Sequence, residues 1–242
     1  MKKILSLMAI AAMLFISCNK NNDPDDPNNP DDPNEYVAPI KIDGNFDDWS
    51  KLEKVQVIKS ASTASKTDIK LAKIYADKFY VFVYVEFDLS AYESFVCEMG
   101  THFDFHFNGD NDTSTGGWKG QWDQGETPCV DVMCQGSIID PDGNPCDYAP
   151  TILKYAGAPN TSEWSWEELP ESDFIIGKGS KKAFEVQITR ELYPLGKLAK
   201  EFGLGIEVLV NGWDATGALP NTDATETNPA GEAPLASIPY TK

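Results

Sequence analysis

Tryptophans in polar surroundings are the residues of this sequence best suited to bind a ligand. An indole face stacks on the apolar CH face of a pyranose, while nearby amides and carboxylates bind its hydroxyl groups. Because tryptophan is buried on average, each indole could instead cover an edge of the core. The candidate ligand-binding residues are Trp118 and Trp122 in a glycine-rich segment, Trp164 and Trp166 with the spacing of one strand face, and Trp213 and Asp214 at the end of a strand.

An Asn/Asp-rich segment over residues 108–116 offers oxygen atoms at alternate positions, as a hard cation such as calcium requires. It is not an EF-hand, because threonine stands where glycine is needed and no acid closes the loop. We expect a looser, structural calcium site at Asn108, Asp110 and Asp112. The alternative is a solvated set of Asx-turns.

His102, Asp104 and His106 alternate along a predicted strand, so their side chains project to one face. The phenylalanines between them project to the other. The trio could bind a transition metal, but alternate Cα atoms lie about 6.6–7 Å apart, which strains one shared ion. The favoured interpretation is a polar sheet face beside a ligand groove.

The overall charge excludes one class of partner. The 242 residues carry 38 acidic and 20 basic side chains, a formal net charge of −18. Nucleic-acid binding needs a positive surface, so we exclude it. A nucleophile elbow, a Walker loop, a dinucleotide fingerprint and an H-E-x-x-H motif are all absent, so we expect no enzyme.

The first 17 residues have the pattern of an export signal. Lys2 and Lys3 precede an apolar run, residues 4–16, that is short for a membrane span and ends at Ser17 and Cys18. Residues 14–18 resemble the lipobox of bacterial lipoproteins, which implies lipidation of Cys18 and anchoring by acyl chains. The alternative is an ordinary cleaved signal in which Cys18 has no role.

Residues 18–35 are predicted to be a disordered tether, because Asn, Asp and Pro dominate and prolines recur every third residue. The acidic stretch resembles the surface-export signal of some outer-membrane lipoproteins. We therefore expect an outer-membrane lipoprotein, with the leaflet left open, that displays one domain over residues 36–242.

Four cysteines lie in that domain: Cys97, Cys129, Cys134 and Cys146. In an oxidising envelope they predict two disulfide bonds, with three pairings possible. A zinc site is the less favoured alternative, because no C-x-x-C pair and no histidine at finger spacing are present.

The domain is predicted to be all-β, an antiparallel sandwich of the immunoglobulin or jelly-roll kind, because short runs of β-forming residues are separated by turn residues. Residues 79–85 are apolar on both faces, as in a strand covered on each side. One short helix is expected near 190–202. The expected strands are 55–58, 70–74, 79–87, 102–107, 130–132, 137–139, 174–176, 183–188 and 204–211.

Several motifs resemble family 9 carbohydrate-binding modules and the related DOMON-type sandwiches. They are the opening Ile-Asp-Gly at 42–44 with Trp49, the strand–turn–strand at 74–83, the strands at 102–112 and 184–188, and the strand with its Asn-x-x-Asp end at 204–214. The resemblance implies a β-sandwich over about residues 40–240, with Trp49 as a packing residue. The C-terminal strand, 235–240, lacks the family's tryptophan, and residues 97–146 are longer than the family's minimum.

These observations together predict a non-catalytic, lipid-anchored domain that binds a polysaccharide or oligosaccharide through exposed aromatic residues. A structural or adhesion lipoprotein with buried tryptophans and a protein partner is the alternative. A haem-binding module, as in some DOMON-type proteins, is a third and weaker hypothesis, for which Met99 and Met133 are the candidate ligands.

Overall fold

The computed structural model describes residues 36–88, 101–170, 175–191, 198–210 and 213–240, and divides the chain into two units, Met1–Ala38 and Pro39–Lys242. Residues 36–38, the described part of the first unit, have no regular secondary structure. The expected leader, the tether and the lipidated Cys18 therefore lie outside the described residues. Within the described ranges, no helix has the length and apolar character needed to cross a membrane.

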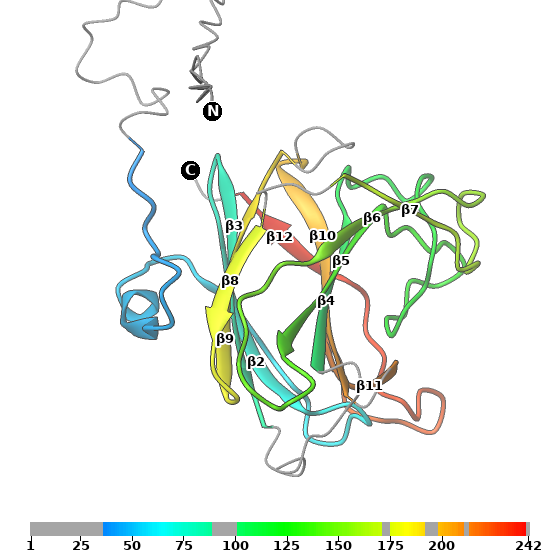
Figure 1. Ribbon diagram of the computed structural model, residues 1–242. Helices are drawn as coiled ribbons and strands as arrows, with labels where there is room; N and C mark the ends of the chain where they lie inside the picture. The colour runs from blue at the N-terminus through cyan, green and yellow to red at the C-terminus, as the bar shows by residue number, and fades with distance from the viewer. Residues whose placement is uncertain (1–35, 89–100, 171–174, 192–197, 211–212, 241–242) are drawn as a thin grey trace, which may run out of the picture. The chain divides into compact units, whose positions relative to one another are not determined.

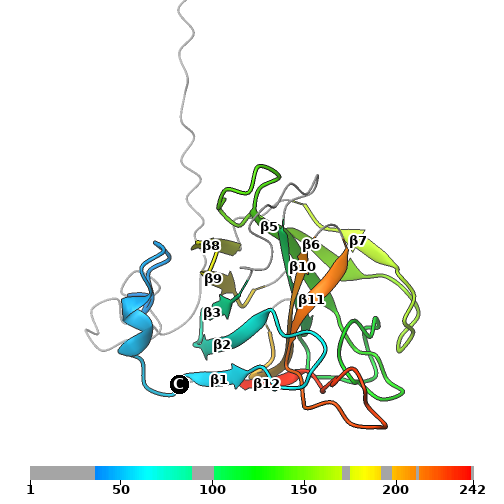
Figure 2. The same cartoon turned by 90° about the horizontal axis from the view of Figure 1, so that it is seen from below.

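Two antiparallel sheets form the second unit, which confirms the predicted β-sandwich (Figure 1). The first sheet has five strands, and Figure 2 shows them following one another in one layer. In spatial order they are β1 (Gln56–Lys59), β2 (Ile69–Ala76), β3 (Tyr80–Phe87), β9 (Ala183–Thr189) and β8 (Ile175–Gly179).

The second sheet has seven strands. Its spatial order is β11 (Asp214–Leu219), β10 (Glu201–Val210), β4 (Thr101–Asn108), β5 (Val132–Ile139), β6 (Thr151–Tyr155) and β7 (Trp166–Glu168), and β12 (Ala236–Pro239) pairs with the first half of β10. The helix that the described residues contain is a 3-10 turn, η1 (Phe46–Ser50).

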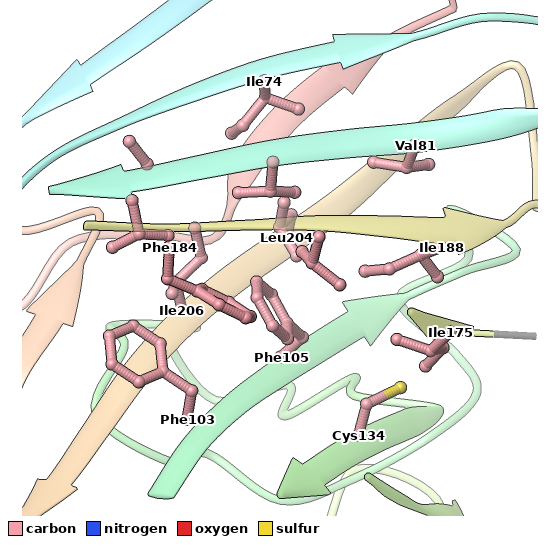
Figure 3. Packing of buried hydrophobic residues seen from close by; sticks show 14 of the residues in the cluster. Ile74, Val81, Phe103, Phe105, Cys134, Ile175, Phe184, Ile188, Leu204 and Ile206 are labelled. Atoms are coloured by element: carbon pink, nitrogen blue, oxygen red, sulfur yellow. The ribbon is translucent and has the colours of Figure 1, made fainter. Parts of the chain in front are cut away.

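The core lies between the sheets and is built from alternating apolar residues. Phe103, Phe105 and Phe107 of β4 are fully buried and point toward the first sheet, where Phe103 lies 5.5 Å from Phe184 of β9 between ring centroids. Figure 3 shows the side chains of both layers meeting there. Because successive strand residues face opposite sides, the even-numbered residues of β4 must project from the outer face of the second sheet.

The outer face of β3 is covered by the start of the domain, as the continuous apolar run predicts. Phe82 packs there with Ile40 and Trp49, and all three are buried. Glu185 of β9 fixes this segment, since its Oε1 accepts hydrogen bonds from the backbone N–H groups of Asp43 and Gly44 at 3.0 and 2.9 Å. Trp49 is a packing residue, as expected.

Some strand boundaries differ from the predictions. The expected strands 130–132 and 137–139 are mostly one strand, β5, that runs through Cys134 and Gly136. Strands β6, β7 and β11 were not expected, because they are short or rich in polar and small residues. The expected helix falls partly on residues 192–197, which are not described, and its predicted end at 202 is wrong because β10 begins at Glu201.

The prediction of disulfide bonds among the described cysteines is wrong. Cys129, Cys134 and Cys146 are free thiols. Cys134 points into the sandwich from β5, where burial raises its pKa, whereas Cys146 is half-buried and its Sγ lies 3.5 Å from the carbonyl oxygen of Ser137. Alternation along β5 therefore separates Cys134 from the loop cysteines. Cys97 lies outside the described residues.

A candidate ligand-binding pocket

The floor of the candidate pocket is the outer face of the second sheet. In the row that crosses the middle of the sheet, Asp104 of β4 pairs with Gln135 of β5 on one side and Glu207 of β10 on the other. In the next row His106 pairs with Met133 and Gly205. The polar side chains that project from the outer face of β4, β5 and β10 therefore lie next to one another in these two rows.

Three indoles rise around this floor. Trp118, Trp164 and Trp213 line a pocket of about 550 Å³, together with Gln121 and with Leu209 of β10. This volume lies in the ordinary range for small-molecule sites. Trp164 and Trp213 are 60% and 57% exposed, so their faces are available to a ligand, and Trp118 is half-buried.

Trp118 and Trp164 belong to two different loops that are joined by hydrogen bonds. The backbone N–H of Trp118 donates to the carbonyl oxygen of Thr161 at 2.7 Å, and the Tyr155 hydroxyl oxygen lies 2.7 Å from the hydroxyl oxygen of Thr161. The Trp118 and Trp164 rings meet edge to face, with centroids 5.0 Å apart and planes at 81°. Trp118 has a φ of 56°, a conformation that is uncommon for a bulky residue.

Trp213 stands on the other side of the floor, beside β10 and β11. Its ring lies 5.4 Å from the imidazole of His102, between centroids. A His102 ring nitrogen lies 3.3 Å from the hydroxyl of Ser137 on β5. The outermost member of the His102, Asp104 and His106 trio therefore supports an indole, while Asp104 and His106 form the floor.

The floor is acidic and almost fully buried. Asp104, His106 and Glu207 are 2%, 1% and 5% exposed. Burial raises the pKa of Asp104 well above its ordinary value, and the nearby Glu207 raises it further. The Asp104 Oδ2 accepts a hydrogen bond from Gln135 Nε2 at 2.7 Å, and His106 Nε2 lies 3.4 Å from Glu207 Oε2.

Trp122 is not the exposed platform that the sequence predicted. Its side chain is fully buried and its Nε1 donates a hydrogen bond to the carbonyl oxygen of Leu219 at 3.1 Å. Gly205 makes this position possible, because a Cβ on that residue would lie 2.5 Å from the indole ring. Polar and glycine neighbours in sequence thus do not keep an indole exposed when a glycine in a distant strand opens space for it.

The remaining predicted ligand-binding residues lie outside the lining of the pocket. Trp166 is half-buried at the start of β7 and packs edge to face on Tyr155 and Trp164, with centroids 5.3 and 6.0 Å away. Asp214 is exposed at the first position of β11, where it pairs with Val210. Trp166 therefore acts as a support for Trp164.

Of the expected calcium ligands, Asn108 is the last residue of β4, and Asp110 and Asp112 lie in the loop that follows. Asp110 and Asp112 are exposed, and each carboxylate accepts the backbone N–H two residues later at 2.8 Å, which is the geometry of Asx-turns. Asp110 also accepts a hydrogen bond from the Thr115 hydroxyl at 2.9 Å. Asn108 is buried, and its amide lies 3.2 Å from Cys129 Sγ.

Several lining residues were not anticipated. Glu207 carries a detectable signal, because it is the one charged residue inside the apolar run 202–210. Gln135, Gln121 and Leu209 carry none, since glutamines and a strand leucine are ordinary in a sandwich. The Gln121 side chain is fixed by a hydrogen bond from Lys66 Nζ.

No family model matches this sequence, and no curated protein matches it. Among solved structures, the fold is similar to a carbohydrate-binding module of family 9 from Caldicellulosiruptor kristjanssonii in complex with glucose. The TM-score is 0.42 and the identity 15%, over 85% of this chain and 93% of that chain.

Proposed function

We propose that this β-sandwich binds a carbohydrate, without transforming it, in the pocket above β4, β5 and β10. The observation that carries the proposal is the placement of Trp118, Trp164 and Trp213 around a floor of buried hydrogen-bonding groups. Indole faces bind the CH faces of sugar rings, and carboxylates and amides bind hydroxyl groups. With Asp104 and Glu207 in the floor, we infer a neutral or amino sugar rather than an acidic one.

The arrangement of the carboxylates supports a binding role over hydrolysis. Glycosidases place two carboxyl groups on either side of the bond they cleave. Asp104 and Glu207 are direct neighbours on adjacent strands and belong to the same floor. They therefore approach a bound sugar from one side, where both can accept hydroxyl hydrogen bonds.

The test is binding of the purified protein to a panel of soluble oligosaccharides and immobilised polysaccharides. We expect Trp164→Ala and Trp213→Ala to weaken binding of the retained glycan at least about tenfold each, which corresponds to about 1.4 kcal/mol. Ile176→Ala is the matched control, because Ile176 is 48% exposed on the opposite sheet and should bind like the parent.

Absence of binding to any neutral or amino glycan, or equal binding by the parent and both tryptophan variants, would contradict the proposal. A structural or adhesion protein would then be the remaining hypothesis. As the structure stands, the exposure of Trp164 and Trp213 argues against that hypothesis, because it assumed buried tryptophans.

The haem hypothesis finds little support in the pocket. Met133 and His106 both line it, but they are direct neighbours on adjacent strands. Both side chains therefore approach from the same side and cannot bind opposite faces of one haem iron. Met99 lies outside the described residues.

We also propose that the chain is an outer-membrane lipoprotein acylated at Cys18, because residues 14–18 resemble a lipobox and the acidic stretch after Cys18 resembles a surface-export signal. Labelling of expressing cells with a palmitate analogue should mark the parent and not Cys18→Ser. Label on both forms, or on neither, would contradict the proposal.

We propose separately that a structural calcium ion binds at Asp110 and Asp112. The support is the presence of two acidic side chains in one exposed loop. Calcium should raise the unfolding temperature of the parent, and Asp110→Asn with Asp112→Asn should abolish the increase. An equal increase in the double variant would place calcium elsewhere.

A further inference from the structure

Three potential metal ligands converge on the floor of the pocket. Asp104, His106 and Glu207 each offer one donor atom, and these atoms all lie within 4.8 Å of one another. Among the described residues they are the one group of three or more histidine, cysteine or acidic side chains with this property. Imidazole with carboxylates is a ligand set for divalent first-row metals.

Two members of this group, Asp104 and His106, have buried polar atoms that find no hydrogen-bond partner in the part of the chain that the structure describes. Asp104 Oδ1 and both ring nitrogens of His106 are buried and make no hydrogen bond. An unpartnered buried polar atom is costly, so its presence needs an explanation. The second oxygen of Asp104 accepts a hydrogen bond from Gln135, which is how proteins orient a carboxylate that binds a metal.

The separation of two of the donors fits a shared ion. His106 Nε2 lies 3.4 Å from Glu207 Oε2, although the pair is not aligned as a hydrogen bond. Two ligands bound at about 2.0–2.1 Å to a tetrahedral zinc ion stand about 3.3 Å apart. β4 and β10 therefore hold His106 Nε2 and Glu207 Oε2 at the distance expected between two ligands of one zinc ion.

The charge of the floor also favours a cation. Asp104 and Glu207 are buried side by side, and the described residues that line the pocket include no lysine or arginine. Two close buried carboxylates repel one another and lose their hydration, and a divalent ion offsets both effects.

We propose that Asp104, His106 and Glu207 bind a divalent first-row transition-metal ion, such as Zn²⁺ or Mn²⁺, at the floor of the pocket. Its remaining coordination positions face the open pocket, where water or an oxygen atom of a ligand can occupy them. The third ligand is therefore Glu207 and not His102, which the sequence offered beside Asp104 and His106. Glu207 pairs with Asp104 across the sheet, and residues paired across a sheet lie closer together than alternate residues along one strand. The inference goes beyond glycan binding and does not depend on it.

The test uses untagged protein stripped with a chelator and titrated with Zn²⁺, Mn²⁺ or Co²⁺ by calorimetry, without any sugar. We expect one ion per chain, and a visible absorption spectrum of the Co²⁺ form that reports nitrogen and oxygen ligands. Asp104→Asn and Glu207→Gln keep the shape of each side chain and should each weaken metal binding at least about tenfold. Glu168→Gln, an exposed carboxylate of β7, is the matched control and should bind as the parent does.

Failure of all three ions to bind would overturn the proposal. So would binding that Asp104→Asn and Glu207→Gln leave unchanged, since the ion would then lie elsewhere. Circular dichroism of each variant checks that it is folded. Glycan binding measured separately, with the chelator and with the ion, distinguishes a failed metal site from a failed carbohydrate site.

Discussion

The indole of Trp122 lies against the imidazole of His106, with ring centroids 4.6 Å apart. The contact joins the loop after β4 to the floor of the pocket. It covers one side of His106, which is 1% exposed, and leaves the imidazole edge near Glu207. Trp122 therefore lies beside His106 on the outer face of the sheet, over Gly205, and holds the imidazole in place.

The space for Trp122 depends on Gly205 of β10. A Cβ at this position would lie 2.5 Å from the indole, and the contact is with a rigid ring. We expect Gly205→Ala to lower the free energy of unfolding by about 1–3 kcal/mol and to shift the emission of the buried indole. Urea unfolding followed by fluorescence measures both effects.

Gly125→Asn is a suitable control for this variant. Nothing lies within 4 Å of a Cβ at Gly125, and its φ of 63° is one that asparagine tolerates. A Gly205→Ala protein as stable as the control would contradict the proposed packing.

Stability should depend on pH through Glu185. This buried carboxylate accepts three hydrogen bonds, from Asp43, Gly44 and Trp49 Nε1, which lower its pKa, but burial has the larger effect and raises it. A raised pKa in the folded state means that the protonated form is favoured by folding. The contribution is complete below the unfolded pKa near 4.5 and is lost as the pH increases through the folded pKa.

Glu185→Gln tests this linkage. Its amide group would face the Trp49 N–H, donor against donor, so we expect a loss of about 1–3 kcal/mol of stability. The difference from the parent should be larger at pH 4 than at pH 7. Chemical denaturation at both pH values measures it, and a difference that grows toward pH 7 would show that the pKa is lowered instead.

The tryptophans should divide into two classes by accessibility. Trp164 and Trp213 are exposed, whereas Trp49 and Trp122 are buried. We expect acrylamide to quench part of the emission readily, and the double variant Trp164→Phe with Trp213→Phe to lose most of that part. A bound glycan should protect the same part in the parent, and quenching unchanged in the double variant would refute this assignment.

The free thiols should differ in reactivity. Burial raises the pKa of all three described thiols, but Cys146 is half-buried whereas Cys129 and Cys134 are buried. A thiol reagent should modify Cys146 in the native protein and reach the other two only after unfolding. Comparison with Cys146→Ser assigns the native reaction, and a mass two units lower per bridge in the denatured, unreduced protein would instead reveal disulfides.

Alternation along strands made much of the fold predictable. In β4 the phenylalanines and the polar residues follow the period of two, so the buried face and the polar face were correctly separated. Short runs of β-forming residues predicted β2 and β9, and a continuous run that is apolar on both faces predicted β3. The opening segment with Trp49 was likewise predicted as a packing element.

Features that depend on residues distant in the chain were decided by the tertiary structure. Glu207 is paired with Asp104 only because β10 lies beside β4, and Trp122 is buried only because Gly205 of the same strand leaves room for it. Cys134 was expected to form a disulfide, but the face on which β5 presents it is the core. The sequence by itself determined which side chains point away from the core, because this follows from local periodicity. Strand pairing decided which of these side chains are neighbours, because residues paired across a sheet have no fixed separation along the chain.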